Sequence, residues 1–203
     1  MPDLLLYYAH PGHRHSRVNR RMYESASDVN DITLVDLYAE YPRNNINVEK
    51  EQTRLLEHNI IVFQFPLFWY SSPALIKQWQ DLVLEYGFAY GPNGTSLVGK
   101  SLALAITAGG PEDAYTHTGY QKHELRTFLT PLEQTAKLCG MHFMLPYVLY
   151  STLVVNDDTI EAHVNGYIRY LNELKSNPEP FDSLGKAQSV LDHHSVLSSY
   201  GEE

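Results

Sequence analysis

Five short, mostly apolar runs, separated by amphipathic or polar segments, make up the hydrophobic pattern of this 203-residue chain. The runs cover Leu4–Ala9, Ile32–Leu37, Asn59–Phe65, Leu102–Thr107 and Met141–Leu149. Each is of strand length, and within each the apolar residues follow one another with little alternation. This pattern is typical of strands that are buried on both faces of a sheet.

Segments with apolar residues at helical spacing lie between and after these runs. We expect helices over residues 17–26, 47–58, 73–83, 125–138 and 159–174. Ser16 is expected to cap the first of them and Ser71 or Ser72 the third. The third helix carries an apolar stripe formed by Leu75, Ile76, Trp79, Leu82 and Val83, so Trp79 is interpreted as a core residue. Strands alternating with helices predict an α/β fold, a three-layer sandwich with a five-stranded parallel sheet and helices on both faces.

Length and composition are consistent with one large domain, which we place over residues 1–175. Residues 176–203 differ in character, because Pro178 and Pro180 break the last helix and few aliphatic residues follow. This C-terminal extension is either partly ordered or an arm that packs on a partner subunit.

Charge and cysteine content exclude several classes of function. The formal net charge is −9 and the pI is about 5.5, which argues against a nucleic-acid partner because that needs a basic face. Cys139 is the single cysteine, which excludes a disulfide framework and a cysteine-based metal site and fits a reducing compartment. Since the longest apolar runs are far shorter than the ~20 residues that span a bilayer, we expect a cytoplasmic protein.

Three loops follow strands and would gather at the carboxyl edge of the sheet, where open α/β folds bind ligands. The loop from His10 to Asn19 leads into a helix, and Ser16 with Arg14 or Arg17 could add a hydroxyl and a charge for an anion. It lacks the G-x-G-x-x-G of dinucleotide turns, so it suits the single phosphate of a mononucleotide such as FMN. Its histidines, His10, His13 and His15, could instead bind metal or serve only the loop, but they lack helical metal-binding spacing, so we expect no metal.

The other two loops suit a flat ring. The backbone of residues 67–70 could run beside a ring edge, with Trp69 or Tyr70 against its face; alternatively these aromatic residues are core or dimer contacts. Gly109 and Gly110 follow the fourth strand and allow a close backbone approach, although a Gly-Gly pair is also an ordinary turn.

Motifs in all three loops carry a resemblance to a known family. They are Ala9-His10-Pro11 with Ser16 and Asn19, Gln64-Phe65-Pro66-Leu67 with Trp69-Tyr70, Pro73 to Lys77, Gly87 to Gly91, Leu97 to Lys100, and Thr107 with Gly109-Gly110. With these the chain resembles the flavodoxin-like NAD(P)H:quinone oxidoreductases of the DT-diaphorase type. Within that family it is most similar to the small bacterial ancillary subunits of the glutathione-gated Kef potassium efflux system. The resemblance covers about residues 4–174.

The resemblance implies a flavodoxin-like fold and a homodimer with FMN, or FAD, at the subunit boundary. The residues that it places on the flavin phosphate are His10, Ser16, Arg17, Val18 and Asn19. Those that it places on the isoalloxazine ring are Leu67, Phe68, Trp69, Tyr70, Thr107, Ala108, Gly109 and Gly110. Catalytic roles fall to Tyr115, which matches the family's tyrosine, and to His117, since the family's histidine position falls near Gln121. Mammalian-type members also have glutamine where this chain has Phe68.

The implied activity is ping-pong transfer of two electrons from NAD(P)H through the flavin to a quinone. An alternative is a regulatory ancillary subunit of a Kef-type antiporter, held peripherally at the inner face of the membrane, with the flavin in a structural or sensing role. A third reading is a flavodoxin-like single-electron carrier.

Overall fold

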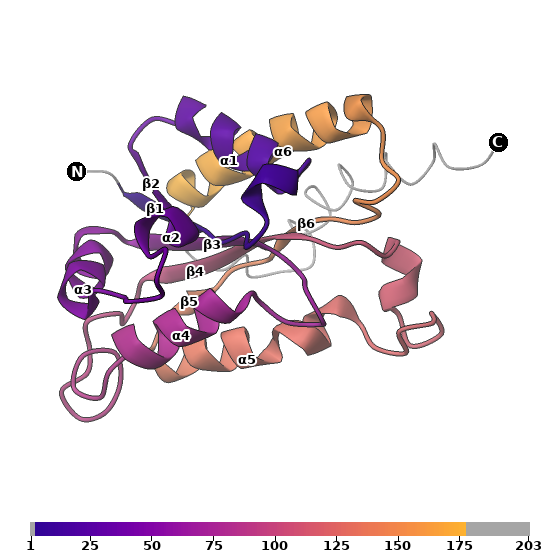
Figure 1. Ribbon diagram of the computed structural model, residues 1–203. Coiled ribbons are helices and arrows are strands. Elements are labelled where there is room, and N and C mark those ends of the chain that lie inside the picture. The colour runs from indigo at the N-terminus through magenta and orange to yellow at the C-terminus, as the bar shows by residue number, and fades with distance from the viewer. Residues whose placement is uncertain (1–2, 178–203) are drawn as a thin grey trace.

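A single parallel sheet forms the centre of the computed structural model, which describes residues 3–177 (Figure 1). The strands are β1 (Leu4–Tyr8), β2 (Ile32–Asp36), β3 (Ile60–Pro66), β4 (Ser101–Thr107), β5 (His142–Phe143) and β6 (Tyr147–Leu149). Their order is β2-β1-β3-β4-β5, with β6 also paired to β4, and every pair is parallel. The predicted sheet is confirmed. The extension predicted for residues 176–203 lies almost wholly outside the described residues and stays a prediction.

Helices cover both faces of the sheet, as predicted. They are α1 (Asn19–Ser25), α2 (Leu37–Glu40), α3 (Val48–Glu57), α4 (Ala74–Val83), α5 (Leu125–Leu138) and α6 (Asp157–Ser176), with 3₁₀ turns η1 (His13–His15), η2 (Ala26–Asp28) and η3 (Glu112–Tyr115). In Figure 1, α1 and α6 lie on one side of the sheet and α4 and α5 on the other. Along β1, Leu4 and Leu6 join the core under α1 and α6, while Leu5 and Tyr7 join the core under α3, α4 and α5.

The fifth predicted strand is interrupted. Between the pairs Leu102–Phe143 and Ala105–Tyr147, two residues of β4 lie opposite three residues, 144–146, of the neighbouring chain segment. One extra residue disrupts the ladder as a bulge does, and Pro146 has no N–H to donate. The prediction of one continuous strand over 141–149 is therefore wrong, and β5 and β6 share that place in the sheet.

The starts of two helices also differ from the prediction. α1 begins at Asn19 with Val18 in the N-cap position, although the Ser16 hydroxyl still accepts the Arg20 N–H at 3.1 Å. α4 follows Pro73 and has no capping side chain, so the prediction of a serine cap is wrong. Trp79 is confirmed as core, being 1% exposed, whereas Leu82 at the end of the same stripe is exposed.

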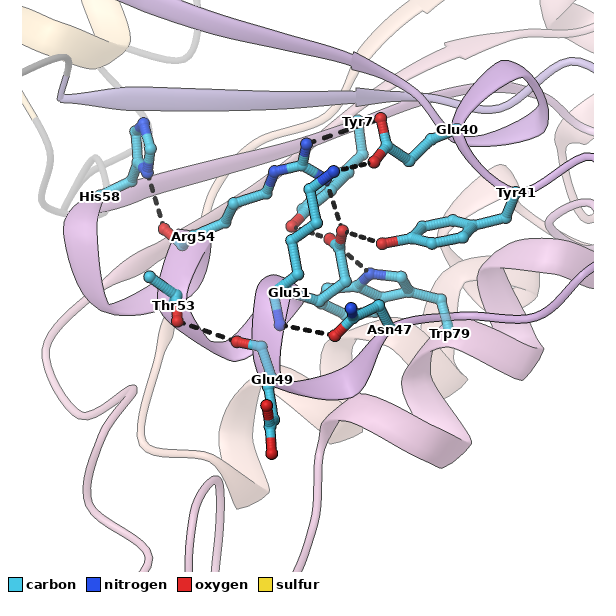
Figure 2. Close-up of polar contacts among 11 residues, drawn as sticks. Tyr7, Glu40, Tyr41, Asn47, Glu49, Glu51, Thr53, Arg54, His58 and Trp79 are labelled. Atoms are coloured by element: carbon cyan, nitrogen blue, oxygen red, sulfur yellow. Dashed lines mark hydrogen bonds and ion pairs between the residues drawn. The ribbon is translucent and has the colours of Figure 1, made fainter.

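A buried carboxylate joins α3 to the sheet and to α4 (Figure 2). Glu51 is fully buried and accepts hydrogen bonds from the hydroxyls of Tyr7 and Tyr41, both at 2.5 Å. Trp79 Nε1 donates to it at 3.0 Å, and an Arg54 guanidinium nitrogen at 2.5 Å supplies the opposite charge. Burial and the negative charge of Glu51 raise the pKa of the Tyr7 hydroxyl, which keeps it protonated as a donor.

Candidate functional site

Three loops meet at the carboxyl edge of the sheet because the strands before them, β1, β3 and β4, are neighbours. We call residues 10–19 the first loop, 67–70 the second loop and 107–110 the third loop. Backbone bonds hold their beginnings side by side: Ala9 N–H donates to the Gln64 carbonyl at 2.9 Å, and Leu67 N–H to the Thr107 carbonyl at 2.8 Å. The rings of His10 and Phe68 meet edge to face with centroids 5.7 Å apart, which brings the first and second loops together.

The end of the first loop offers backbone donors. The N–H groups of Arg17, Val18 and Asn19 have no hydrogen-bond partner within residues 3–177. The Val18 and Asn19 residues are themselves nearly buried. Because these N–H groups have no acceptor in the described chain, they are available to a bound anion or to water. Ser16 lies at the same turn, with its hydroxyl engaged by the helix.

His10 is held as a neutral ring at the start of the first loop. The Gly12 N–H donates to its Nδ1 at 3.1 Å, so the neutral ring carries its proton on Nε2. Burial, followed by electrostatic interaction with His13, lowers the pKa of His10. Its Nε2–H is therefore a neutral hydrogen-bond donor beside the second loop.

The other two histidines of the first loop point elsewhere. His13 Nδ1 lies 3.0 Å from the Tyr8 hydroxyl, and His15 is exposed. Across the described part of the chain, no group of three or more His, Cys, Asp and Glu side chains is placed to hold a metal ion. Arg17 forms an exposed ion pair with Asp157, which Arg21 shares at 3.0 Å.

The second loop is a tight turn in an uncommon conformation. Phe68 and Ser71 exchange two backbone hydrogen bonds of 3.1 Å, and the residues between them, Trp69 and Tyr70, have φ values of 49° and 64°. Positive φ at both central positions is the geometry of a type I′ turn, which normally takes Asn and Gly. Two aromatic residues there carry backbone strain, which is typical of functional sites.

This turn leaves its central residues open. The N–H groups of Trp69 and Tyr70 have no partner in the described structure, and the Trp69 side chain is 92% exposed. Tyr70 packs against Phe128 of α5 with ring centroids 5.1 Å apart. The neighbouring Leu67 and Phe68 N–H groups are used within the chain, so the loop's two N–H groups without a partner among the described residues are those at its tip.

In the third loop, as in the second, some backbone N–H groups are bonded within the chain and others are not. Ala108 N–H donates to the Leu149 carbonyl at 2.8 Å, and the Gly110 N–H is directed at the Tyr115 hydroxyl, but the Gly109 N–H has no partner among the described residues. A β-carbon at Gly110 would lie 3.0 Å from the Tyr120 hydroxyl, so a side chain there would crowd Tyr120 and Tyr115. A β-carbon at Gly109 would meet only Leu153, at an ordinary 3.5 Å. The chain's own packing therefore gives no reason for glycine at position 109.

Two tyrosine hydroxyls stand beside the third loop. The Tyr115 and Tyr120 hydroxyl oxygens lie 3.4 Å and 3.0 Å from the position of a β-carbon at Gly110. Burial, followed by interaction with Tyr120 and Tyr70, raises the pKa of Tyr115, which keeps that hydroxyl protonated. His117, in contrast, is 78% exposed and pairs with Glu124 at 3.3 Å, without a described contact to any of the three loops. The sequence analysis did not predict Tyr120 as a site residue, because it lies in no recognisable motif or spacing.

A family model with the description "flavodoxin-like fold" matches residues 3–171. The chain belongs to this flavodoxin-like family. Among curated relatives, the KefG ancillary protein of the glutathione-regulated potassium-efflux system of Serratia proteamaculans is 41% identical over 179 residues, covering 88% of this chain and 96% of that protein. The recognition of Kef ancillary proteins as relatives is thus confirmed.

The solved structures that are similar to this chain include a protein in complex with FMN and a quinone reductase. General stress protein 14 of Treponema denticola, in complex with FMN, is 33% identical with a TM-score of 0.80, covering 85% of this chain and 99% of that one. An NADPH-quinone reductase from P. pentosaceus is 27% identical with a TM-score of 0.74, covering 83% and 96%. Within the described residues of this flavodoxin-like chain, no helix has both the length and the apolar character needed to cross a membrane.

Proposed function

We propose that this protein is an FMN-dependent NAD(P)H:quinone oxidoreductase. One observation carries the proposal: three adjacent loops present backbone N–H groups for which the described chain supplies no acceptor. These groups belong to Arg17, Val18, Asn19, Trp69, Tyr70 and Gly109. A flavin mononucleotide has the matching acceptors, a phosphate at one end and carbonyl oxygens along the edge of its ring. The FMN complex and the NADPH-quinone reductase among the similar structures support the same assignment.

Each loop has its own task in this proposal. The first loop holds the single phosphate through its backbone donors, with the neutral His10 as a further donor. Trp69 and Tyr70 N–H groups take one stretch of the ring edge, and the Gly109 N–H takes another. The position of Gly109, which the protein does not need as glycine, leaves room for the ring to approach the backbone. FAD is accommodated less well, because the first loop has donors for only one phosphate.

When bound, FMN supplies the redox chemistry, accepting a hydride from NAD(P)H and delivering two electrons to a quinone. The protein's own part is to orient the quinone and to stabilise the charge that develops on it. The protonated hydroxyl of Tyr115 donates a hydrogen bond to a quinone oxygen, and Tyr120 places a second hydroxyl beside it. We assign this second position to Tyr120 because His117 is turned to Glu124.

A cofactor assay followed by kinetics tests this function. The purified protein should show a flavin spectrum or bind added FMN, release a flavin with the mass of FMN, and oxidise NADPH or NADH in the presence of menadione. Tyr115→Phe should lower kcat/KM for the quinone by roughly ten- to a hundredfold, with flavin reduction by NAD(P)H unchanged. Tyr86→Phe, an exposed tyrosine outside the three loops, is the control. A colourless protein that binds neither FMN nor FAD would refute the proposal.

The KefG relatives favour a second function, and the two functions are compatible. An identity of 41% over 88% of the chain to KefG supports an ancillary role on a Kef-type potassium efflux protein, with the protein cytoplasmic and peripheral at the inner face of the membrane. The test is binding of the purified protein to the isolated cytoplasmic domain of a potassium–proton antiporter encoded beside it. Failure to bind at micromolar concentration would count against this second role and leave the enzyme untouched.

A further inference from the structure

Four buried polar side chains form an unbroken chain of hydrogen bonds from α6 to the first and third loops. The Tyr167 hydroxyl donates to Gln64 Oε1 at 3.0 Å. Gln64 Nε2 donates to the Asn19 carbonyl at 2.7 Å and to Asn19 Oδ1 at 3.1 Å. Asn19 Nδ2 then donates to Thr107 Oγ1 at 2.5 Å. All four residues are buried, the most accessible of them to only 5%.

The direction of every bond in this network follows from the Asn19 backbone carbonyl, which can only accept. It places the Gln64 amide nitrogen toward Asn19 and the amide oxygen toward α6. The Tyr167 hydroxyl, which burial keeps protonated by raising its pKa, is therefore the donor to that oxygen. The Gln64 amide nitrogen in turn holds both acceptors of Asn19, leaving the Asn19 amide nitrogen to bond Thr107. In a buried site each of these groups is costly to leave unpaired.

The position of Gln64 lets it join two loops. It lies on β3, between β1 and β4, so its side chain reaches the first loop from the strand in between. Asn19 closes the first loop and starts α1, and Thr107 is the last residue of β4. Gln64 and Tyr167 are not among the residues that carry the proposed flavin contacts. They act on residues that are.

We propose that Gln64 and Tyr167 are positioning residues for the flavin: they hold Asn19 and Thr107 at a set separation before the ligand arrives. The backbone donors of the first loop and the donor of the third loop are then already spaced for the two ends of one FMN. Preorganisation of this kind raises affinity by removing an ordering cost from the binding step. The identity of the ligand rests on the proposed function, but the coupling of the two loops does not.

A pair of tyrosines on α6 provides a matched test. Tyr167→Phe removes the donor to Gln64, while Tyr170→Phe removes a similar buried donor, whose hydroxyl bonds the Leu145 carbonyl at 2.8 Å. Both variants should lose stability to a similar degree. FMN titration should show roughly three- to tenfold weaker binding for Tyr167→Phe and no more than about a twofold change for Tyr170→Phe. Equal affinities in the two variants would overturn the proposal.

Hydrogen–deuterium exchange of the flavin-free protein gives a readout that does not depend on FMN. Tyr167→Phe should speed exchange in peptides that contain residues 16–20 and 107–110, and Tyr170→Phe should not. If the wild type binds no flavin, the proposed function fails, and this exchange experiment alone decides the coupling. Unchanged exchange in both peptides would refute it.

If Tyr167→Phe does not fold, variants at Thr107, the other end of the hydrogen-bond network, test the proposal instead. Thr107→Val removes the hydroxyl that Asn19 bonds, and Thr107→Ser retains it. Thr107→Val should weaken FMN binding and speed exchange around residues 16–20, and Thr107→Ser should restore both. If Ser and Val behave alike, the hydroxyl is not the link and the proposal is wrong.

Discussion

At the scale of single residues, Glu51 shows how a polar side chain can organise a core. The sequence predicted a polar-faced helix over residues 47–58, and nothing in the pattern distinguished Glu51 from its charged neighbours. In the structure it is fully buried and joins three elements through Tyr7, Trp79 and Arg54 (Figure 2). A buried charge with several donors is not necessarily stabilising compared with an apolar core, but removing it leaves those donors without a partner.

We therefore expect Glu51→Ala to lower the free energy of unfolding by about 3–5 kcal/mol, since it removes the closer of the two carboxylates that pair with Arg54 and strands three further donors. Tyr41→Phe removes only one donor and should cost about 1 kcal/mol. Urea unfolding followed by fluorescence measures both. If the free energy of unfolding of Glu51→Ala is within about 1 kcal/mol of the wild-type value, the cluster contributes little to stability.

At the scale of elements, the second loop combines strain with exposure. A type I′ turn suits glycine and asparagine, yet Trp69 sits at φ 49° with its ring exposed to solvent. A left-handed conformation costs an ordinary residue about 1–2 kcal/mol. Because the Trp69 side chain is 92% exposed, packing within the described chain does not explain a tryptophan at this strained position. We infer that the ring serves the ligand or a partner.

Trp69→Gly should then raise the free energy of unfolding by about 0.5–1 kcal/mol and at the same time weaken FMN binding roughly three- to tenfold. Asp31→Gly is the control, since Asp31 has φ 53° but precedes β2 and so lies at the opposite edge of the sheet. It should give a similar or smaller gain in stability with unchanged FMN affinity. Thermal unfolding with and without FMN measures both effects. Unchanged FMN affinity in Trp69→Gly would show that the Trp69 ring does not contribute to the flavin site.

At the scale of the whole molecule, large apolar side chains are exposed at the carboxyl edge. Leu153 and Val154 are each 82% exposed, and a β-carbon at Gly109 would touch Leu153. Together with Trp69 they place three large apolar side chains on loops around the proposed flavin site. Large exposed apolar surface is typical of an interface. This supports the homodimer that the family resemblance implies, with the flavin at the subunit boundary.

We expect the wild type to sediment as a dimer and Leu153→Asp to shift it toward monomer, because an isologous interface would bury the new charge twice. Leu138→Asp is the matched control: Leu138 is also exposed but ends α5, away from the three loops. Sedimentation velocity at micromolar concentration distinguishes the species. A monomeric wild type, or a Leu153→Asp dimer as stable as the control, would place the dimer elsewhere or exclude it.

The sequence by itself determined the order and type of the elements. Hydrophobic periodicity is a local property, so the strands, the main helices and the Trp79 core position could be predicted from it. Prediction from periodicity failed at residues 144–146, where one extra residue interrupts the hydrogen-bond ladder of the sheet. It also failed before α4, where a helix cap depends on backbone geometry. Motifs on the three loops were also visible, because they are short runs of residue types that can be recognised along the chain.

Only the tertiary structure decided which of these residues work together. The order β1-β3-β4 puts three loops from distant parts of the chain at one edge, and Tyr167 meets Gln64 across 103 positions. Burial of Glu51, the positive φ values of the second loop and the place of Tyr120 beside Gly110 likewise depend on long-range packing. Such contacts leave no periodic trace, since hydrogen bonding between side chains depends on distance in space and not on spacing in sequence.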